Sequence, residues 1–144
     1  MTSDDGRWPA DQFEICNLLA RLSHLADAGN LEEYAELFTE DGRWEPPPGS
    51  EPPTRALCGR AELLAGARER RAAGMSGPGT FSRHVVTNIA LTKTGPDTAA
   101  SHSYWHYYTH TNDIHQTGGM GTYDDEFRRT PAGWRLASRI SRLG

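Results

Sequence analysis

Asp27 and His84 are the residues of this sequence whose chemical types and positions most favour proton-transfer chemistry. The imidazole of a histidine accepts and donates protons near neutral pH, so His84 is a candidate general base or acid. Asp27 stands where the first helix is expected to end, and a carboxylate is disfavoured there because the helix C-terminus is itself negative. A histidine that donates to this carboxylate would offset the repulsion, and the carboxylate would in turn orient the imidazole.

Both residues also have structural interpretations, and the residues alone leave these open. A hydrogen-bonded histidine without a catalytic role fits the same predicted strand, in which alternation places His84 and Asn88 on one face. On a helical wheel, Asp27 lies off the centre of the apolar stripe of the first helix, so helical geometry does not direct it toward the core. A solvated carboxylate near a helix end therefore remains an alternative.

Other patterns predict no metal site, cofactor or nucleophile. His102, His106 and His110 recur at four-residue intervals, but in a strand that interval spans about 13 Å, too far for two of them to bind one ion. No nucleophile elbow, phosphate-binding loop or dinucleotide-binding glycine motif occurs. The mixed-charge run at residues 68–71 is interpreted as a solvated helix face.

Composition excludes several classes of function. The chain has 144 residues and a formal net charge of −4, so no global basic field favours nucleic acid or anionic lipid. No apolar run approaches the roughly 20 residues that cross a bilayer, and the polar, acidic N-terminus is unlike a signal peptide. Cys16 and Cys58 match no disulfide framework or zinc pattern, so we expect two reduced structural thiols and a cytoplasmic protein.

The periodicity of apolar residues predicts three helices followed by a sheet, in one domain spanning residues 1–144. Helices are expected at residues 8–28, 31–38 and 59–73. A turn at Asp41-Gly42 precedes a short strand at residues 43–45, and the proline-rich segment 46–54 is interpreted as a surface loop, either a plain connector or the border of a pocket. Long hairpin-linked strands are predicted at residues 81–92, 98–111, 118–129 and 134–141.

Three segments together resemble SnoaL-like domains of the NTF2-like superfamily, in the group of scytalone dehydratase and hexachlorocyclohexane dehydrochlorinase. They are residues 15–44 with their Ala-Asp-Ala-Gly-Asn-Leu-Glu-Glu-Tyr sequence, the Ser-Arg-His-Val-Val-Thr-Asn strand, and the Gly-Thr-Tyr-Asp-Asp-Glu-Phe and Gly-Trp-Arg-Leu-Ala-Ser-Arg ending. The resemblance spans about residues 10–141. It implies an α+β cone, in which three N-terminal helices pack against a strongly curved, mostly antiparallel sheet around one pocket.

The same resemblance implies site residues and a mode of action. The dyad of that group falls on Asp27 and His84, and a pocket arginine near the last strand falls on Arg139. At three other positions the chain departs from the group, with Leu22, Ala26 and Ser103 in place of residues that handle the leaving group. The resemblance also implies a homodimer or homotrimer.

One face of the strand at residues 98–111 is expected to line the pocket. Ala99, Ser101 and Ser103 are small enough for the inner side of a curved sheet, and the same parity continues to Trp105 and Tyr107. Together with Trp44 and Tyr123 these aromatic residues would form walls suited to a ring-containing substrate, although plain core packing is an alternative for each. The predicted substrate-binding residues are Trp44, Asn88, Ser103, Trp105, Tyr107 and Tyr123.

The resulting hypothesis is a small cofactor-independent enzyme in which an Asp–His dyad moves a proton on a small, mostly apolar, cyclic substrate. Elimination, isomerisation and cyclisation are all compatible with such a dyad, and Arg139 would stabilise the negative charge that develops. The alternative is a non-catalytic ligand-binding or accessory domain, including a partner resembling the β-subunit of an oxygenase, because one fold hosts many functions.

Overall fold

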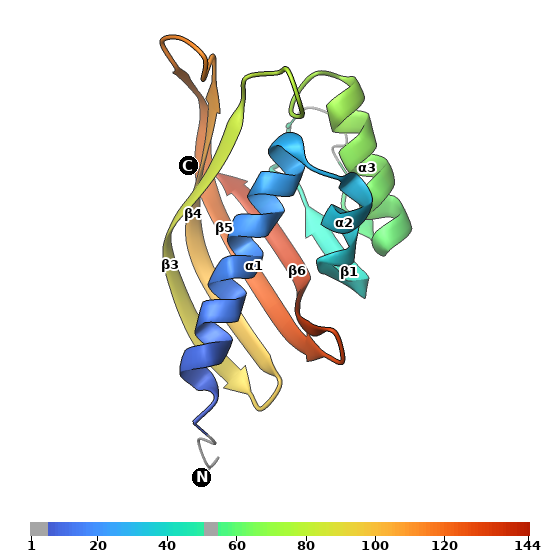
Figure 1. Ribbon diagram of the computed structural model, residues 1–144, viewed down its shortest axis with the longest axis vertical. Helices are drawn as coiled ribbons and strands as arrows, with labels where there is room; N and C mark the ends of the chain where they lie inside the picture. The colour runs from blue at the N-terminus through green and yellow to red at the C-terminus, as the bar shows by residue number, and fades with distance from the viewer. Residues whose placement is uncertain (1–5, 51–54) are drawn as a thin grey trace.

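A strongly curved six-stranded sheet wraps round the N-terminal helix in the computed structural model (Figure 1). The structure describes residues 6–50 and 55–144. The strand order is β2-β1-β6-β5-β4-β3; β1 and β6 are parallel, and the other neighbouring pairs in this order are antiparallel. In chain order the elements are α1 (Trp8–Ala28), α2 (Leu31–Glu36), β1 (Phe38–Glu45), β2 (Leu57–Cys58), α3 (Arg60–Ala72), β3 (Arg83–Gly95), β4 (Thr98–Thr109), β5 (Gln116–Thr130) and β6 (Gly133–Leu143). The predicted α+β architecture is confirmed.

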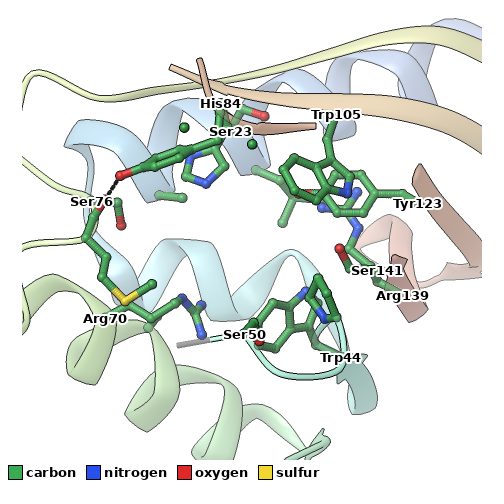
Figure 2. A pocket seen from close by; sticks show the side chains of 18 of the residues that line it. Ser23, Trp44, Ser50, Arg70, Ser76, His84, Trp105, Tyr123, Arg139 and Ser141 are labelled. Carbon is green, nitrogen blue, oxygen red and sulfur yellow. Dashed lines mark hydrogen bonds between the residues drawn. The ribbon is translucent and has the colours of Figure 1, made fainter. Parts of the chain in front are cut away.

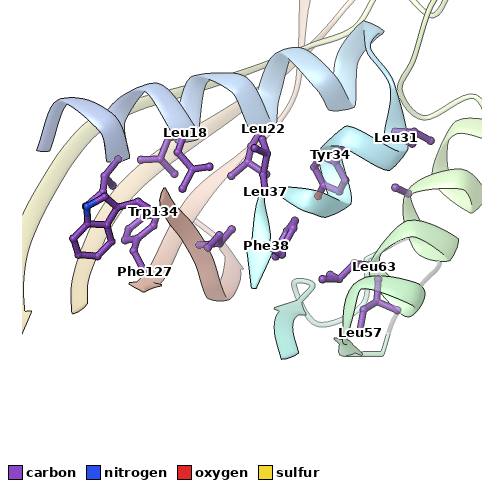
Figure 3. Packing of buried hydrophobic residues seen from close by; sticks show 14 of the residues in the cluster. Leu18, Leu22, Leu31, Tyr34, Leu37, Phe38, Leu57, Leu63, Phe127 and Trp134 are labelled. Atoms are coloured by element: carbon purple, nitrogen blue, oxygen red, sulfur yellow. The ribbon is translucent and has the colours of Figure 1, made fainter. Parts of the chain in front are cut away.

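Helix α1 lies along the concave face of the sheet, and α2 and α3 pack beside it next to β1 (Figure 1). Pro9 lies in the first turn of α1. The backbone N–H groups of a first turn have no acceptor within the helix, so the N–H that proline lacks costs nothing. The apolar stripe of α1 is buried against the strands, with Ile15 fully buried and Leu22 only 2% exposed. Figure 3 shows this stripe meeting Phe127 and Trp134 of the sheet. Each such side chain contributes roughly 1.5–3 kcal/mol by leaving water.

The structure corrects the predicted turn at Asp41-Gly42. Both residues lie inside β1, where the register against β6 shifts between Phe38 and Arg43. Gly42 packs so tightly that a Cβ there would lie 2.8 Å from the Cβ of Phe38. The glycine therefore permits a close approach within the strand rather than a chain reversal.

Residues 46–50, the described part of the proline-rich segment, do not form a plain surface connector. Pro46 and Pro47 are buried, and Pro47 lines the cavity described below, so this part borders a pocket. Residues 51–54 of the prediction lie outside the described residues. The two cysteines are free, and both are exposed rather than buried in the core. Within the described ranges, no helix is long and apolar enough to cross a membrane.

Candidate active site

The side chains of Asp27 and His84 meet where the end of α1 crosses the start of β3. The Nδ1 atom of His84 lies 2.6 Å from Oδ1 of Asp27, and the backbone N–H of His84 donates to Oδ2 at 3.0 Å. Because an ionised carboxylate only accepts hydrogen bonds, Nδ1 carries the proton in this contact. The carboxylate therefore fixes both the backbone and the tautomer of His84, and leaves Nε2 as the free ring nitrogen.

Arg71 of α3 explains how a carboxylate is tolerated at the end of α1. Its guanidinium donates to the carbonyl oxygens of Leu25, Ala26 and Gly29, at 3.1, 3.2 and 2.8 Å. These are the terminal carbonyls that carry the negative end of the helix dipole. A partly buried cation thus compensates this end of the helix, and Asp27 can remain 4% exposed beside it.

His84 faces a cavity of about 340 Å³ that is walled mainly by apolar and aromatic side chains (Figure 2). Figure 2 shows His84 and Trp105 on one side of this space and Arg70 and Trp44 on the other. The aromatic residues that line it are Tyr34, Trp44, Trp105, Tyr107 and Tyr123. The cavity size is within the range of sites for small organic ligands.

The predicted inner face of β4 is confirmed. Ala99, Ser101 and Ser103 are buried, and Trp105 and Tyr107 continue the same parity into the cavity wall. The ring of Tyr107 lies 5.0 Å from that of His84, centroid to centroid, and its hydroxyl donates to a backbone carbonyl in the loop after α3. One neighbour of the imidazole is thereby held in place.

Glycines of β5 let these aromatic rings lie flat against the sheet. A Cβ at Gly121 would lie 2.6 Å from the ring of Trp105, and one at Gly118 would lie 2.7 Å from the ring of Tyr107. Side chains at these positions would push both rings into the cavity. The glycine cluster of residues 118–121 therefore serves close packing, as one expects where glycine interrupts a strand.

Arg139 reaches the cavity wall but its charge is already balanced. Its Nε and Nη2 donate to the two carboxylate oxygens of Asp125 at 2.8 and 2.9 Å, and its guanidinium carbon lies 3.8 Å from the ring centroid of Tyr123. Burial favours loss of the charge, but the attraction of Asp125 outweighs it and raises the pKa of Arg139. Burial disfavours the charged form of Tyr123 as well and therefore raises its pKa, so this phenol stays neutral.

Two predicted binding residues lie away from the cavity. Asn88 is exposed and adopts a φ of 54°, and the register between β3 and β4 shifts between Thr87 and Ala90. This bulge reverses the alternation, so that Ile89 packs on the core and Asn88 points outward. Ser103 does face inward, but it is fully buried and does not line the cavity.

Most of the cavity side that faces His84 was not predicted from the sequence. Ser50, Arg70, Met75 and Ser76 all line it, although Arg70 and Arg71 belong to the run interpreted as a solvated face. A signal existed in the helical spacing. Arg70 follows the buried Leu63 by seven residues, so the two side chains share a face of α3.

His102 of β4 pairs with Asp124 on the outer face of the sheet, at 2.7 Å between Nδ1 and Oδ1, with half of its side chain exposed. In the described part of the chain, no three histidine, cysteine, aspartate or glutamate side chains gather as ligands for one ion.

Comparison with known proteins places the chain in a family. The model of the SnoaL-like domain matches residues 10–140, so the protein belongs to the SnoaL-like family. No curated protein matches its sequence.

Solved structures agree with this assignment. An NTF2-like protein with a cystatin-like fold from Novosphingobium aromaticivorans is 27% identical, with a TM-score of 0.81 over 99% of this chain and 92% of that one. Two other proteins of that organism show the same fold. One, provisionally named a scytalone dehydratase, is 20% identical with a TM-score of 0.74, over 94% of this chain and 85% of that one. The other, provisionally named an aromatic ring hydroxylase, is 22% identical with a TM-score of 0.75, over 93% and 89%.

Proposed function

We propose that the protein is a small cofactor-independent enzyme in which His84, oriented by Asp27, acts as general base. The observation that supports this most directly is the 2.6 Å contact between Nδ1 of His84 and a buried carboxylate, beside a cavity of about 340 Å³. With its proton on Nδ1, the imidazole presents the Nε2 lone pair to a substrate. Asp27 then stabilises the imidazolium that forms when Nε2 takes a proton.

The walls of the cavity support a small, mostly apolar, cyclic substrate. The aromatic rings of Trp44, Trp105 and Tyr107 offer flat surfaces to a ring-containing molecule. Leu22 and Ala26 line the same cavity, so two of the positions that depart from the scytalone dehydratase group are apolar here. We therefore propose proton abstraction as the shared first step of an elimination, isomerisation or cyclisation, with no acid from α1 assisting a leaving group.

Arg139 takes a different role from the one expected from the sequence. Because Asp125 accepts two of its hydrogen bonds, little net charge is left for a developing anion. We assign Arg139 to positioning the ring of Tyr123, over which its guanidinium lies. The negative charge formed by proton abstraction then requires another partner.

Hydrogen–deuterium exchange tests the general base without the natural substrate. The probe is 2-tetralone, a cyclic ketone with acidic C–H bonds, followed in D2O by proton NMR. The wild type should accelerate exchange, and His84→Gln should lower the enzymatic rate by about 10²–10⁴-fold. The matched control is His102→Gln, which removes a histidine with the same carboxylate contact on the outer face and should change nothing.

Exchange catalysed equally well by His84→Gln would contradict the role of His84 as the base. A wild type that does not accelerate exchange would favour the alternative of a non-catalytic ligand-binding or accessory domain. An accessory role in a larger oxygenase further predicts copurification with a catalytic subunit, whereas an enzyme acting by itself purifies alone.

A further inference from the structure

The side of the cavity opposite His84 carries polar groups that have no hydrogen-bond partner among the described residues. These groups are Nη1 of Arg70 and Oγ of Ser50, and both are shielded from solvent. Both residues line the cavity, and in Figure 2 they extend into it from the side that carries Trp44. Leaving a buried donor unpaired is costly, so native proteins rarely do so without a reason.

The charge of Arg70 is also not balanced by a neighbouring carboxylate. Within residues 6–50 and 55–144 it forms no ion pair, and its guanidinium lies over the face of Trp44, with 4.6 Å from the guanidinium carbon to the ring centroid. Stacking on an aromatic ring holds the plane of a guanidinium but neutralises none of its charge. Arg70 is therefore the cavity arginine available to a ligand, in contrast to Arg139 with its carboxylate.

Unpaired buried atoms alone would not define a subsite. The hydroxyls of Ser101 and Ser103 are also unpaired, but neither residue lines the cavity. Nε1 of Trp105 is also unpaired and Trp105 lines the cavity, but this donor is neutral. Arg70 and Ser50 differ because an N–H and an O–H lie at the same cavity wall beside an uncompensated charge. The group that satisfies both is an oxygen carrying negative charge.

We propose that Arg70 and Ser50 form a subsite for an anionic oxygen, either a carboxylate or phenolate of the substrate or the enolate oxygen that forms when His84 removes a proton from carbon. The substrate then spans the cavity, with this oxygen at Arg70 and its acidic proton near His84. The subsite rests on the proposed function in taking the cavity as the substrate site, and the orientation of the substrate also rests on His84 as the base. It names the substrate class as ring-containing acids or enolisable carbonyl compounds.

Two probe ligands of matched shape test the subsite. They are 2-naphthoate and its neutral amide, 2-naphthamide, and binding is followed by titration calorimetry with the fluorescence of Trp44 and Trp105 as a second readout. The wild type should bind the naphthoate about 10- to 100-fold more tightly, the value of a charge-assisted hydrogen bond. Arg70→Met should abolish this preference by weakening naphthoate alone, and Ser50→Ala should reduce it by about three- to tenfold.

Two further variants control for charge and folding. Arg68→Met also removes one positive charge from α3, but Arg68 pairs with Glu32 at the surface. The Arg68→Met protein should therefore prefer naphthoate as strongly as the wild type does. Arg70→Lys keeps the charge and should keep part of the preference even if Arg70→Met folds poorly. Equal binding of the two ligands by the wild type, or binding of neither, overturns the subsite. So does a full preference in Arg70→Met.

The outcome separates this inference from the general base. His84→Gln should keep its preference for naphthoate, because the anion subsite lies across the cavity from the imidazole. A wild type without preference that still catalyses deuterium exchange through His84 refutes the subsite alone. A preserved preference together with undiminished exchange in His84→Gln refutes the base alone.

Discussion

Replacing Asp27 with asparagine should reverse the tautomer of His84. The carboxylate accepts from two donors of one residue, the backbone N–H at 3.0 Å and the ring Nδ1–H at 2.6 Å. An asparagine side chain offers one oxygen and one NH2 group, so it satisfies only one of these donors. The backbone N–H cannot lose its proton, but the imidazole can move its proton from Nδ1 to Nε2. The ring should therefore accept from the asparagine and present an N–H to the cavity.

The structure also sets the size of the effect. Asp27→Asn replaces charge-assisted hydrogen bonds of a buried carboxylate with neutral ones, which should cost about 2 kcal/mol in the free energy of unfolding. Deuterium exchange into 2-tetralone should fall by about 10²–10⁴-fold, because Nε2 no longer has a free lone pair. Asp124→Asn is the matched control, because its contact with His102 has nearly the same length but is about half exposed. It should cost less than about 1 kcal/mol and leave exchange unchanged.

Long-range nitrogen–proton NMR correlations of the histidine rings report the tautomer directly, with no need for a substrate. The wild type should show a protonated Nδ1 and an unprotonated Nε2 at His84, and Asp27→Asn should show the reverse. A wild-type ring protonated on Nε2, or a tautomer that is the same in both proteins, would refute the argument from hydrogen-bond donors.

Two further predictions concern stability. The hydrogen bonds that Arg129 and Trp134 donate to Asp11 hold the pKa of this carboxyl below its usual range, against the opposing effect of burial. The contribution of Asp11 to stability is present above the unfolded pKa of about 3.9 and is lost as pH falls through the lower folded pKa. Asp11→Asn should therefore flatten the loss of unfolding free energy as the pH falls below about 5, as measured by urea titration. Gly121→Ala would place a Cβ 1.8 Å from the carbonyl oxygen of Arg142, so it should cost about 3 kcal/mol in the same assay, and a cost below about 0.5 kcal/mol would contradict the packing.

The sequence predicts best where a simple period decides the outcome. The parity of β4 follows from three small residues, Ala99, Ser101 and Ser103, and it extends correctly to Trp105 and Tyr107. The same reasoning fails on β3, because a single extra residue reverses the alternation between Thr87 and Ala90. Asparagine tolerates positive φ, but nothing in the local pattern marks Asn88 as the place of the bulge.

The site itself depends on contacts between distant segments, and periodicity does not report these. Asp27 lies 57 residues before His84, and their pairing was expected only from family resemblance. The wall opposite His84 comes from Ser50, Arg70 and Met75, in two separate parts of the chain. A helical wheel of α3 places Arg70 with Leu63, but it cannot show that this face meets a cavity rather than solvent.

The adjacent residues Arg70 and Arg71 connect the two ends of the proposed chemistry. Successive side chains of a helix point about 100° apart, so α3 sends Arg71 to the end of α1 and Arg70 into the cavity. Arg71 offsets the negative helix end beside Asp27, which allows that carboxylate to stay buried and to orient His84. Arg70 has no such partner in the described chain, and its charge is left to the ligand. Helix α3 thus supplies two cations: Arg71, which stabilises the helix end that holds Asp27, and Arg70, which would stabilise the negative charge formed when His84 removes a proton.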